Sequence, residues 1–348
     1  MIKVLIVEDS RVEQELLAHI LGSDPQIQVV GIVGDGERAI AEVKRLHPDL
    51  VTMDIHMPRM NGFETTRRLM EESPLPIVIV SGSFSRSDSD KTFRALESGA
   101  LAVVRKPRGI GHPGYREDAR ELINNVRSMS EVKVVKRWPR LRREQLRQPL
   151  PAVVRAPAEI RVVAIGASTG GPAVIQKILS GLPRRFAAPV LVVQHMSTGF
   201  MESFVDWLTV TSGFPSHVAL HGDSPLPGNA YFAPDGCHMQ VGNNGQIVLT
   251  KDEPDNGLRP SVARLFRSVT ETYGRNAVGI LLTGMGRDGA DELKKMRDRG
   301  GVTIVQDQES SIIFGMPGEA VKQDAADYVF APEQIAEYLA QHVKAGKG

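Results

Sequence analysis

The chain has 348 residues, of which 41% are hydrophobic and 24% charged, and its formal net charge is +1. This length predicts two domains, and the near-neutral charge argues against a nucleic-acid-binding protein. The single cysteine, Cys237, excludes an internal disulfide framework and is typical of a reducing compartment. No apolar run approaches the ~20 residues of a membrane span, and the chain starts with a strand pattern rather than a signal peptide. We therefore expect a cytoplasmic protein without membrane insertion.

Residues 1–128 alternate short apolar runs with helical segments. Each run is of the kind that forms a buried strand, and helix-type periodicity follows the early ones. Five strands alternating with helices predict a doubly wound, flavodoxin-like parallel α/β sheet. The predicted strands are 3–7, 27–33, 49–53, 76–80 and 101–104.

Polar side chains stand at the ends of four of these strands. Ligands of open parallel sheets bind beyond the carboxyl ends of the strands, so we expect these side chains to converge. Three carboxylates in one crevice repel each other unless a cation lies among them, and oxygen ligands suit Mg²⁺. A carboxylate beside Mg²⁺ can attack a phosphoryl donor and become an aspartyl phosphate. The side chains are Glu8, Asp9, Asp54, Ser81 and Lys106.

Each of these residues has a predicted role. Asp54 is the phosphoacceptor, and Glu8 and Asp9 ligate the metal together with it. Lys106 pairs with the phosphoryl oxygens, and the hydroxyl of Ser81 senses them. A purely structural interpretation explains one polar or charged residue at a strand end but not five such residues at four strand ends.

These residues resemble the receiver domain of two-component response regulators. The resemblance implies phosphorylation of Asp54, Mg²⁺ as cofactor and the backbone carbonyl of His56 as a further metal ligand. Two positions depart from the pattern: Val103 stands where an aromatic residue is frequent, and His56 where an acidic residue is common in the second family named below. The matching motifs are Val-Glu-Asp-Ser (7–10), Met-Asp-Ile-His-Met-Pro-Arg-Met-Asn-Gly-Phe-Glu (53–64) and Arg-Lys-Pro (105–107).

Residues 129–158 interrupt the alternation of strands and helices. Between residues 131 and 155 there are eight Lys or Arg and two Glu, and several prolines block a long helix. We predict a semi-rigid interdomain linker with a helical start, between a receiver domain at 1–128 and a catalytic domain at 159–348. Its positive charge could recruit an acidic partner, although a solvated linker is the simpler interpretation.

The pattern of strands and helices resumes at residue 159. Three shorter patches at 230–233, 238–241 and 247–250 are separated by Gly and Asn-Gly turns and indicate an antiparallel flap or edge. We predict a second α/β domain, a Rossmann-like parallel sheet with a β-hairpin flap. Its parallel strands are expected at 160–165, 190–193, 278–282 and 302–305.

Ser168, His195 and Asp288 each stand beyond the end of a predicted strand. A serine hydroxyl is a poor nucleophile unless a base accepts its proton, and a carboxylate must orient that base. Pro172 marks the start of a helix just after Ser168, and the free N–H groups of a helix start favour a phosphate or an oxyanion. The three residues therefore predict a Ser-His-Asp triad.

Two known motifs resemble the segment around Ser168, and the sequence argues against both. Residues 166–170 match the nucleophile elbow of α/β-hydrolases, but that fold orders its triad Ser, Asp or Glu, His, whereas the order here is Ser, His, Asp. A dinucleotide fingerprint requires glycine where Ser168 stands and an acidic residue at the end of the next strand, where Gln194 and His195 stand.

The carboxyl-terminal half resembles the catalytic domain of CheB, the chemotaxis protein-glutamate methylesterase. The resemblance implies that the substrates are methylated chemoreceptors, whose glutamate γ-methyl esters are hydrolysed and whose glutamines are deamidated, and that a CheA-type histidine kinase is the phosphodonor. Ser197 and Ala263 depart from the family pattern. The motifs are Ala-Ile-Gly-Ala-Ser-Thr-Gly-Gly-Pro (164–172), Gln-His-Met (194–196), Gly-Phe and Ser-Phe (199–204), Leu-Arg-Pro-Ser-Val (258–262), Leu-Thr-Gly-Met-Gly-Arg-Asp-Gly-Ala (282–290) and Gly-Met-Pro (315–317).

This resemblance makes Ser168 the nucleophile, His195 the base and Asp288 its orienting carboxylate. The backbone N–H groups of Thr169 and Met285 are the oxyanion candidates, and no cofactor is needed in this half.

Two other functions stay open. The chain could act mainly as a phosphorylation-dependent binding module on a receptor array, or as a regulator with a DNA-binding output, although only one helix is predicted after residue 331.

Overall fold

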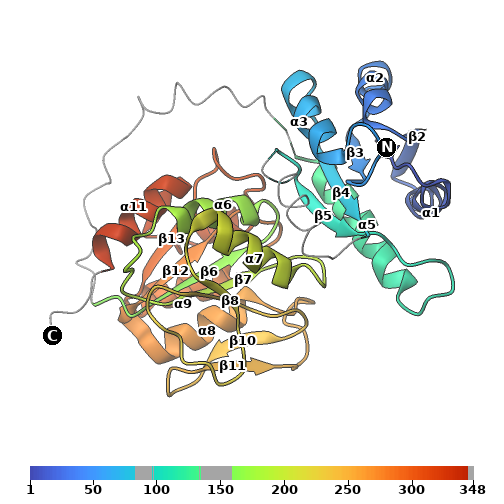
Figure 1. Ribbon diagram of the computed structural model, residues 1–348. Coiled ribbons are helices and arrows are strands. Elements are labelled where there is room, and N and C mark those ends of the chain that lie inside the picture. Colours follow the sequence, from blue (N-terminus) through green and yellow to red (C-terminus); the bar gives the residue numbers. More distant parts are fainter. Residues whose placement is uncertain (83–95, 97, 133, 135–158, 344–348) are drawn as a thin grey trace. The chain divides into compact units, whose positions relative to one another are not determined.

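The computed structural model of this chain describes residues 1–82, 96, 98–132, 134 and 159–343. The chain divides into two compact units, Met1–Arg147 and Gln148–Gly348 (Figure 1). Most of the predicted linker lies outside the described residues. The predicted domain boundaries therefore stay a prediction.

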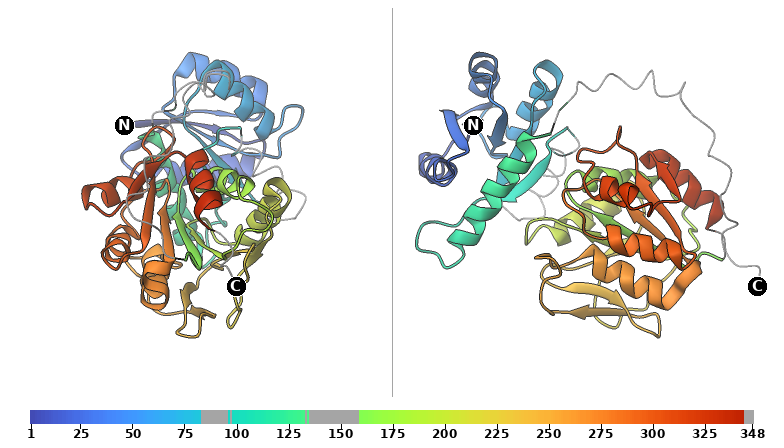
Figure 2. Two further views of the ribbon diagram at one scale, coloured as in Figure 1. Left: turned by 90° about the vertical axis from the view of Figure 1, so that its left-hand side faces the viewer. Right: turned by 180° about the vertical axis from the view of Figure 1, so that it is seen from behind.

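The first unit is a five-stranded parallel sheet with helices on both faces. Its described elements are β1 (Ile2–Val7), α1 (Arg11–Gly22), β2 (Ile27–Val33), α2 (Gly36–Leu46), β3 (Leu50–Met53), α3 (Gly62–Glu72), β4 (Ile77–Ser81), β5 (Ala102–Arg105) and α5 (Tyr115–Ser130). The strand order is β2-β1-β3-β4-β5, and every neighbouring pair is parallel. Helix α1 contacts α5, and α2 contacts α3 on the other face (Figure 2). The predicted flavodoxin-like fold is confirmed.

Burial explains why the sequence forms this sheet. All four residues of β3 and the last four of β1 are buried, as expected for central strands covered on both faces. The edge strand β2 is only partly buried. Asp54 directly follows β3, and Glu8 directly follows β1, so the two carboxylates leave the sheet at neighbouring strand ends.

The second unit is a seven-stranded sheet of parallel neighbours in the order β14-β13-β12-β6-β7-β9-β8. Helices α6 and α7 pack together on one face, and α8 and α9 pack together on the other (Figures 1 and 2). The predicted Rossmann-like sheet is confirmed. Its elements are β6 (Val162–Ala167), α6 (Gly171–Ser180), β7 (Val190–Gln194), α7 (Met201–Ser212), β8 (Ser216–Val218), β9 (Ala230–Phe232), β10 (His238–Val241), β11 (Ile247–Thr250), α8 (Val262–Tyr273), a short 3-10 helix (Gly274–Asn276), β12 (Ala277–Leu281), α9 (Ala290–Asp298), β13 (Val302–Gln306), α10 (Met316–Lys322), β14 (Tyr328–Phe330) and α11 (Pro332–His342).

One part of the predicted flap is wrong. The hairpin of β10 and β11 is antiparallel as predicted, with Gly245 at φ +81° in its turn. The patch at 230–233 is not part of it, because β9 pairs in parallel with β7 and β8. All three residues of β9 are buried, which suits a strand inside the parallel sheet rather than a flap.

The described residues after 331 contain one helix, α11, as the sequence predicts. None of the helices in the described ranges combines the length and apolarity that crossing a bilayer requires.

Gly62 brings the start of α3 against the backbone that follows β3. A methyl group on Gly62 would lie 2.0 Å from the backbone oxygen of Asp54. The side chain of Asn61 caps the helix and accepts a hydrogen bond from the N–H of Glu64 at 2.9 Å. The glycine is therefore required by a contact between two backbone segments, which cannot move aside as a flexible side chain can.

We expect Gly62→Ala to destabilise the first unit by about 1–3 kcal/mol, because the added methyl group forces these backbone segments apart. Urea unfolding of the full chain, followed by hydrogen exchange in residues 1–82, measures the change. Gly22→Ala is the control, since a methyl group there meets nothing within 4 Å. Equal stability of the two variants would contradict this account.

Candidate active site and phosphoacceptor site

Register places Ser168 and His195 at neighbouring strand ends. Ala167 on β6 pairs with Gln194 on β7, and each is followed directly by a predicted catalytic residue. The N–H of His195 donates to the carbonyl of Ala167 at 2.9 Å, which extends the ladder by one step. Ser168 and His195 are both described, and no hydrogen bond joins the Ser168 hydroxyl to the His195 ring. Their direct contact stays a prediction.

Asp288 is buried and faces the ring of His195. Its Oδ2 lies 3.0 Å from Nε2 of His195. It also accepts hydrogen bonds from the backbone N–H groups of Val262 (2.7 Å) and Ala263 (3.0 Å), and from the Ser261 hydroxyl (3.0 Å). The carboxylate thus occupies the N-terminus of α8, where free N–H groups and the helix dipole favour negative charge.

These contacts determine the charge of Asp288. Burial alone would raise the pKa of this carboxyl, but His195 and the two backbone N–H groups outweigh burial and hold the pKa below its usual range. Asp288 is therefore ionised at neutral pH. Nε2 of His195 lies near this carboxylate without a hydrogen bond of good geometry. A tautomer that carries its proton on Nε2, toward Asp288, leaves the lone pair on Nδ1, the nitrogen that can then accept a proton.

The two predicted oxyanion segments lie against each other. The Ser168 N–H donates to the carbonyl of Thr283 at 3.0 Å, and the Thr283 hydroxyl contacts the carbonyl of Thr169 at 2.9 Å. A methyl group on Gly284 would lie 2.7 Å from Cβ of Ser168. In the described part of the chain, neither the N–H of Thr169 nor that of Met285 donates to a backbone carbonyl, and their role as oxyanion donors stays a prediction.

The phosphoacceptor candidates of the first unit also converge. Lys106 Nζ lies 2.7 Å from Oε2 of Glu8 and 3.3 Å from Oδ1 of Asp54. Burial, together with the charge of Asp54, raises the pKa of Glu8 to about 7 against the opposing contact with Lys106. Burial alone would lower the pKa of Lys106, but its contacts with the two carboxylates raise it. Ser81 is fully buried at the end of β4, whose neighbour β5 precedes Lys106.

The acidic cluster could bind a metal ion. One carboxylate oxygen from each of Glu8, Asp9 and Asp54 lies within 4.8 Å of the others. In the described part of the chain, neither buried oxygen of Asp54 has a hydrogen-bond donor of good geometry. A hard cation with oxygen ligands suits such a donor set. The side chain of His56 is exposed, and the role of its carbonyl as a ligand stays a prediction.

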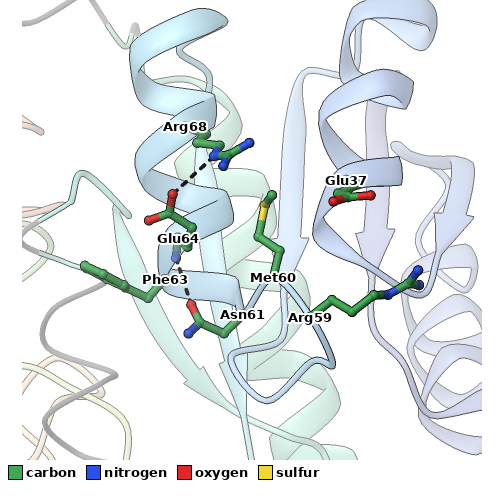
Figure 3. A pocket seen from close by; sticks show the side chains of 7 residues that line it. All are labelled: Glu37, Arg59, Met60, Asn61, Phe63, Glu64 and Arg68. Atoms are coloured by element: carbon green, nitrogen blue, oxygen red, sulfur yellow. Dashed lines mark hydrogen bonds and ion pairs between the residues drawn. The ribbon is translucent and has the colours of Figure 1, made fainter.

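A surface pocket of the first unit contains neither the acidic cluster nor Lys106 and Ser81. It is formed beside α2 and the start of α3 (Figure 3). Arg68 contacts Glu64 at 3.1 Å within it. None of the predicted site residues lines it, and we assign it no chemistry. Its lining residues are Glu37, Arg59, Met60, Asn61, Phe63, Glu64 and Arg68.

The sequence did not predict three residues whose side chains form hydrogen bonds with residues of the candidate active site. Ser261 and Thr283 contact catalytic segments through hydroxyls, as described above. The sequence predicts no role for Gln194, yet its amide donates to the carbonyls of both Ser168 and His195. The position of Gln194 at the end of a buried strand, next to the base, was the available signal.

Family models match both halves of the chain: CheB methylesterase over residues 163–339 and response regulator receiver domain over residues 4–112. The protein-glutamate methylesterase/protein-glutamine glutaminase 1 of Syntrophus aciditrophicus (strain SB) is 57% identical over 342 residues, which are 97% of either chain. This chain belongs to the CheB methylesterase family. A relative from Geobacter metallireducens, named protein-glutamate methylesterase/protein-glutamine glutaminase 4, is 53% identical over 340 residues, 97% of this chain and 98% of the relative.

A solved CheB structure agrees with the second unit. The crystal structure of the Thermotoga maritima CheB methylesterase catalytic domain matches with a TM-score of 0.51 and 36% identity, covering 53% of this chain and 99% of that chain. The CheB family match starts within β6 and ends within α11. It therefore contains Ser168, His195 and Asp288, and the receiver match contains the acidic cluster and Lys106.

We expect Asp288→Asn to lower the free energy of unfolding of the second unit by about 1–3 kcal/mol at pH 7, because an amide cannot accept from all of these donors. A carboxyl whose pKa is lowered on folding adds stability above its unfolded pKa and loses it as pH falls through the folded pKa. The difference from wild type should therefore shrink below about pH 4.

Denaturant unfolding across pH checks this expectation. Asp298→Asn is the control, since its carboxylate forms an exposed pair with Lys294, and it should change stability by less than about 0.5 kcal/mol. A loss in Asp288→Asn that is the same at pH 3 and pH 7 would contradict the assigned ionisation.

Proposed function

We propose that this CheB-family enzyme hydrolyses glutamate γ-methyl esters on the cytoplasmic helices of chemoreceptors and deamidates receptor glutamines. The relatives named above carry both activities in their names. The observation that most supports this proposal is the contact of the His195 ring with the buried Asp288 carboxylate. His195 follows β7, the strand next to β6, which ends just before Ser168. The enzyme would act in the cytoplasm, where those helices lie.

The reaction uses Ser168 as nucleophile. Its Oγ attacks the ester carbonyl carbon while His195 accepts the hydroxyl proton, and Asp288 stabilises the imidazolium that forms. The N–H groups of Thr169 and Met285 donate to the oxyanion, a contribution of about 3–4 kcal/mol for one such donor. The carbon–oxygen bond to the methoxy group then breaks, and methanol leaves with the proton from His195.

Water completes the cycle. His195 accepts a proton from water as the water oxygen attacks the acyl carbon. The bond from that carbon to Ser168 Oγ then breaks, His195 returns the proton to Oγ, and a glutamate side chain is released. With a glutamine substrate the first leaving group is ammonia instead of methanol, and the second half is the same. Each step moves one proton through the same ring.

The first unit regulates this site through Asp54. An oxygen of Asp54 attacks the phosphorus of the donor, such as a CheA-type histidine kinase, and the bond to the donor's leaving group breaks. Lys106 contacts the phosphoryl oxygens, and Ser81 responds to them. Mg²⁺ held by Glu8, Asp9, Asp54 and the His56 carbonyl would neutralise charge during the transfer. We propose that the unphosphorylated receiver limits access to Ser168.

We expect Ser168→Ala to abolish methanol release from a methylated receptor fragment, because no other group supplies the nucleophile. Gas chromatography of released methanol measures it. Ser180→Ala, at the exposed end of α6, is the control and should keep wild-type activity. Turnover by Ser168→Ala at the wild-type rate would exclude the triad, and the absence of methanol release in wild type would favour the receptor-binding module.

Removal of divalent metal should affect the phosphorylation of the first unit and leave the esterase activity of the second unit unchanged. We expect EDTA to stop phosphorylation by a small-molecule phosphodonor, because uncompensated carboxylates repel the incoming phosphoryl group. Basal methanol release should stay unchanged, since each step at Ser168 is complete without a metal. Phosphoprotein gels and the methanol assay measure the two effects. Phosphorylation that continues in EDTA at the original rate would contradict the proposed metal site.

A further inference from the structure

Gln194 joins the two catalytic segments through one amide group. Its Nε2 donates to the carbonyl of Ser168 at 2.8 Å and to the carbonyl of His195 at 2.7 Å. A primary amide has two N–H groups, so both are used, one on the nucleophile's residue and one on the base's residue. No other side chain among the described residues bonds to the backbone carbonyls of both.

The amide is held in a confined site. Gln194 is 2% exposed at the end of β7. A methyl group on Gly171 would lie 2.0 Å from its Oε1, so this glycine leaves the space that the amide occupies. Gly171 also donates its N–H to the Ser168 carbonyl at 2.9 Å, which therefore has two donors. A buried amide with so little space has few alternative positions.

The remaining backbone bonds explain why this amide matters. The N–H of His195 is fixed on the carbonyl of Ala167, and the N–H of Ser168 on the carbonyl of Thr283. These bonds hold the amino side of each residue. On the carbonyl side, Ser168 accepts from Gly171 as well as from Gln194, and the amide of Gln194 is what links the Ser168 carbonyl to the His195 carbonyl.

We propose that Gln194 is a positioning residue that sets the distance and direction between the Ser168 hydroxyl and the His195 ring. This inference rests on the proposed esterase function. Both hydrogen bonds of the Gln194 amide go to backbone carbonyls, so it acts on the reaction through Ser168 and His195. A misplacement of about 1 Å between reacting groups can cost about 100-fold in rate.

Two variants of the full chain test the role. Gln194→Met keeps the length of the side chain and removes both donors, and Gln194→Glu keeps Oε1 and places an oxygen where the two carbonyls need a donor. We expect each to lower kcat for methanol release by about 10- to 100-fold and to leave KM within about twofold, because receptor binding does not involve this buried amide. The rate of Ser168 labelling by a fluorophosphonate should fall by a similar factor.

Gln176→Met is the matched control. Gln176 donates from its amide to the Thr211 carbonyl and the Ser180 hydroxyl, and so joins α6 to α7 without touching a catalytic residue. It should keep wild-type kcat and labelling even if its melting temperature falls. Gln194→Met and Gln194→Glu are compared with it at temperatures where all variants are folded; if the Met variant does not fold, the Glu variant serves as the test.

The outcomes distinguish the two proposals. Wild-type kcat and labelling in a folded Gln194 variant would overturn the positioning role and leave the esterase function intact. A raised KM with unchanged kcat would also overturn it. A wild-type chain that neither releases methanol nor reacts with the fluorophosphonate would instead overturn the proposed function.

Discussion

The contact between His195 and Asp288 is the interaction on which the active site depends. A buried carboxylate is costly unless donors surround it, and Asp288 accepts from two backbone N–H groups and a hydroxyl, with Nε2 of His195 3.0 Å away. The donors come from the start of α8, more than 20 residues away in the sequence. Folding of α8 against the loop after β12 therefore creates an ionised aspartate, and this aspartate faces the ring of His195, the proposed base.

Parallel register explains why both units place their chemistry at the carboxyl ends of strands. In the first unit, β1 and β3 end side by side, so Glu8 and Asp54 meet near Lys106. In the second, the adjacent strands β12, β6 and β7 end in the loops that contain Met285, Ser168 and His195. The same geometry thus serves phosphoryl transfer in one unit and acyl transfer in the other.

The sequence was sufficient to predict both sheets and the residues at their strand ends. Short apolar runs such as those before Ser168 and Asp54, in alternation with helical periodicity, indicate parallel strands, and residue type then limits the chemistry. The parallel pairing of β9 could not be predicted, because a run of three apolar residues does not show whether the strand pairs in a parallel or an antiparallel sense. The amide bonds of Gln194 and the capping of α8 by Asp288 could not be predicted either, since both depend on segments that meet only after folding.

The most direct test of this account compares methanol release by the wild-type chain and Asp54→Asn, with a methylated receptor fragment, Mg²⁺ and a small-molecule phosphodonor. The account predicts that the donor accelerates wild type and leaves Asp54→Asn at its basal rate, because only wild type can form the aspartyl phosphate. Equal acceleration of both proteins, or no effect of the donor on wild type, would contradict the regulation of Ser168 chemistry through Asp54.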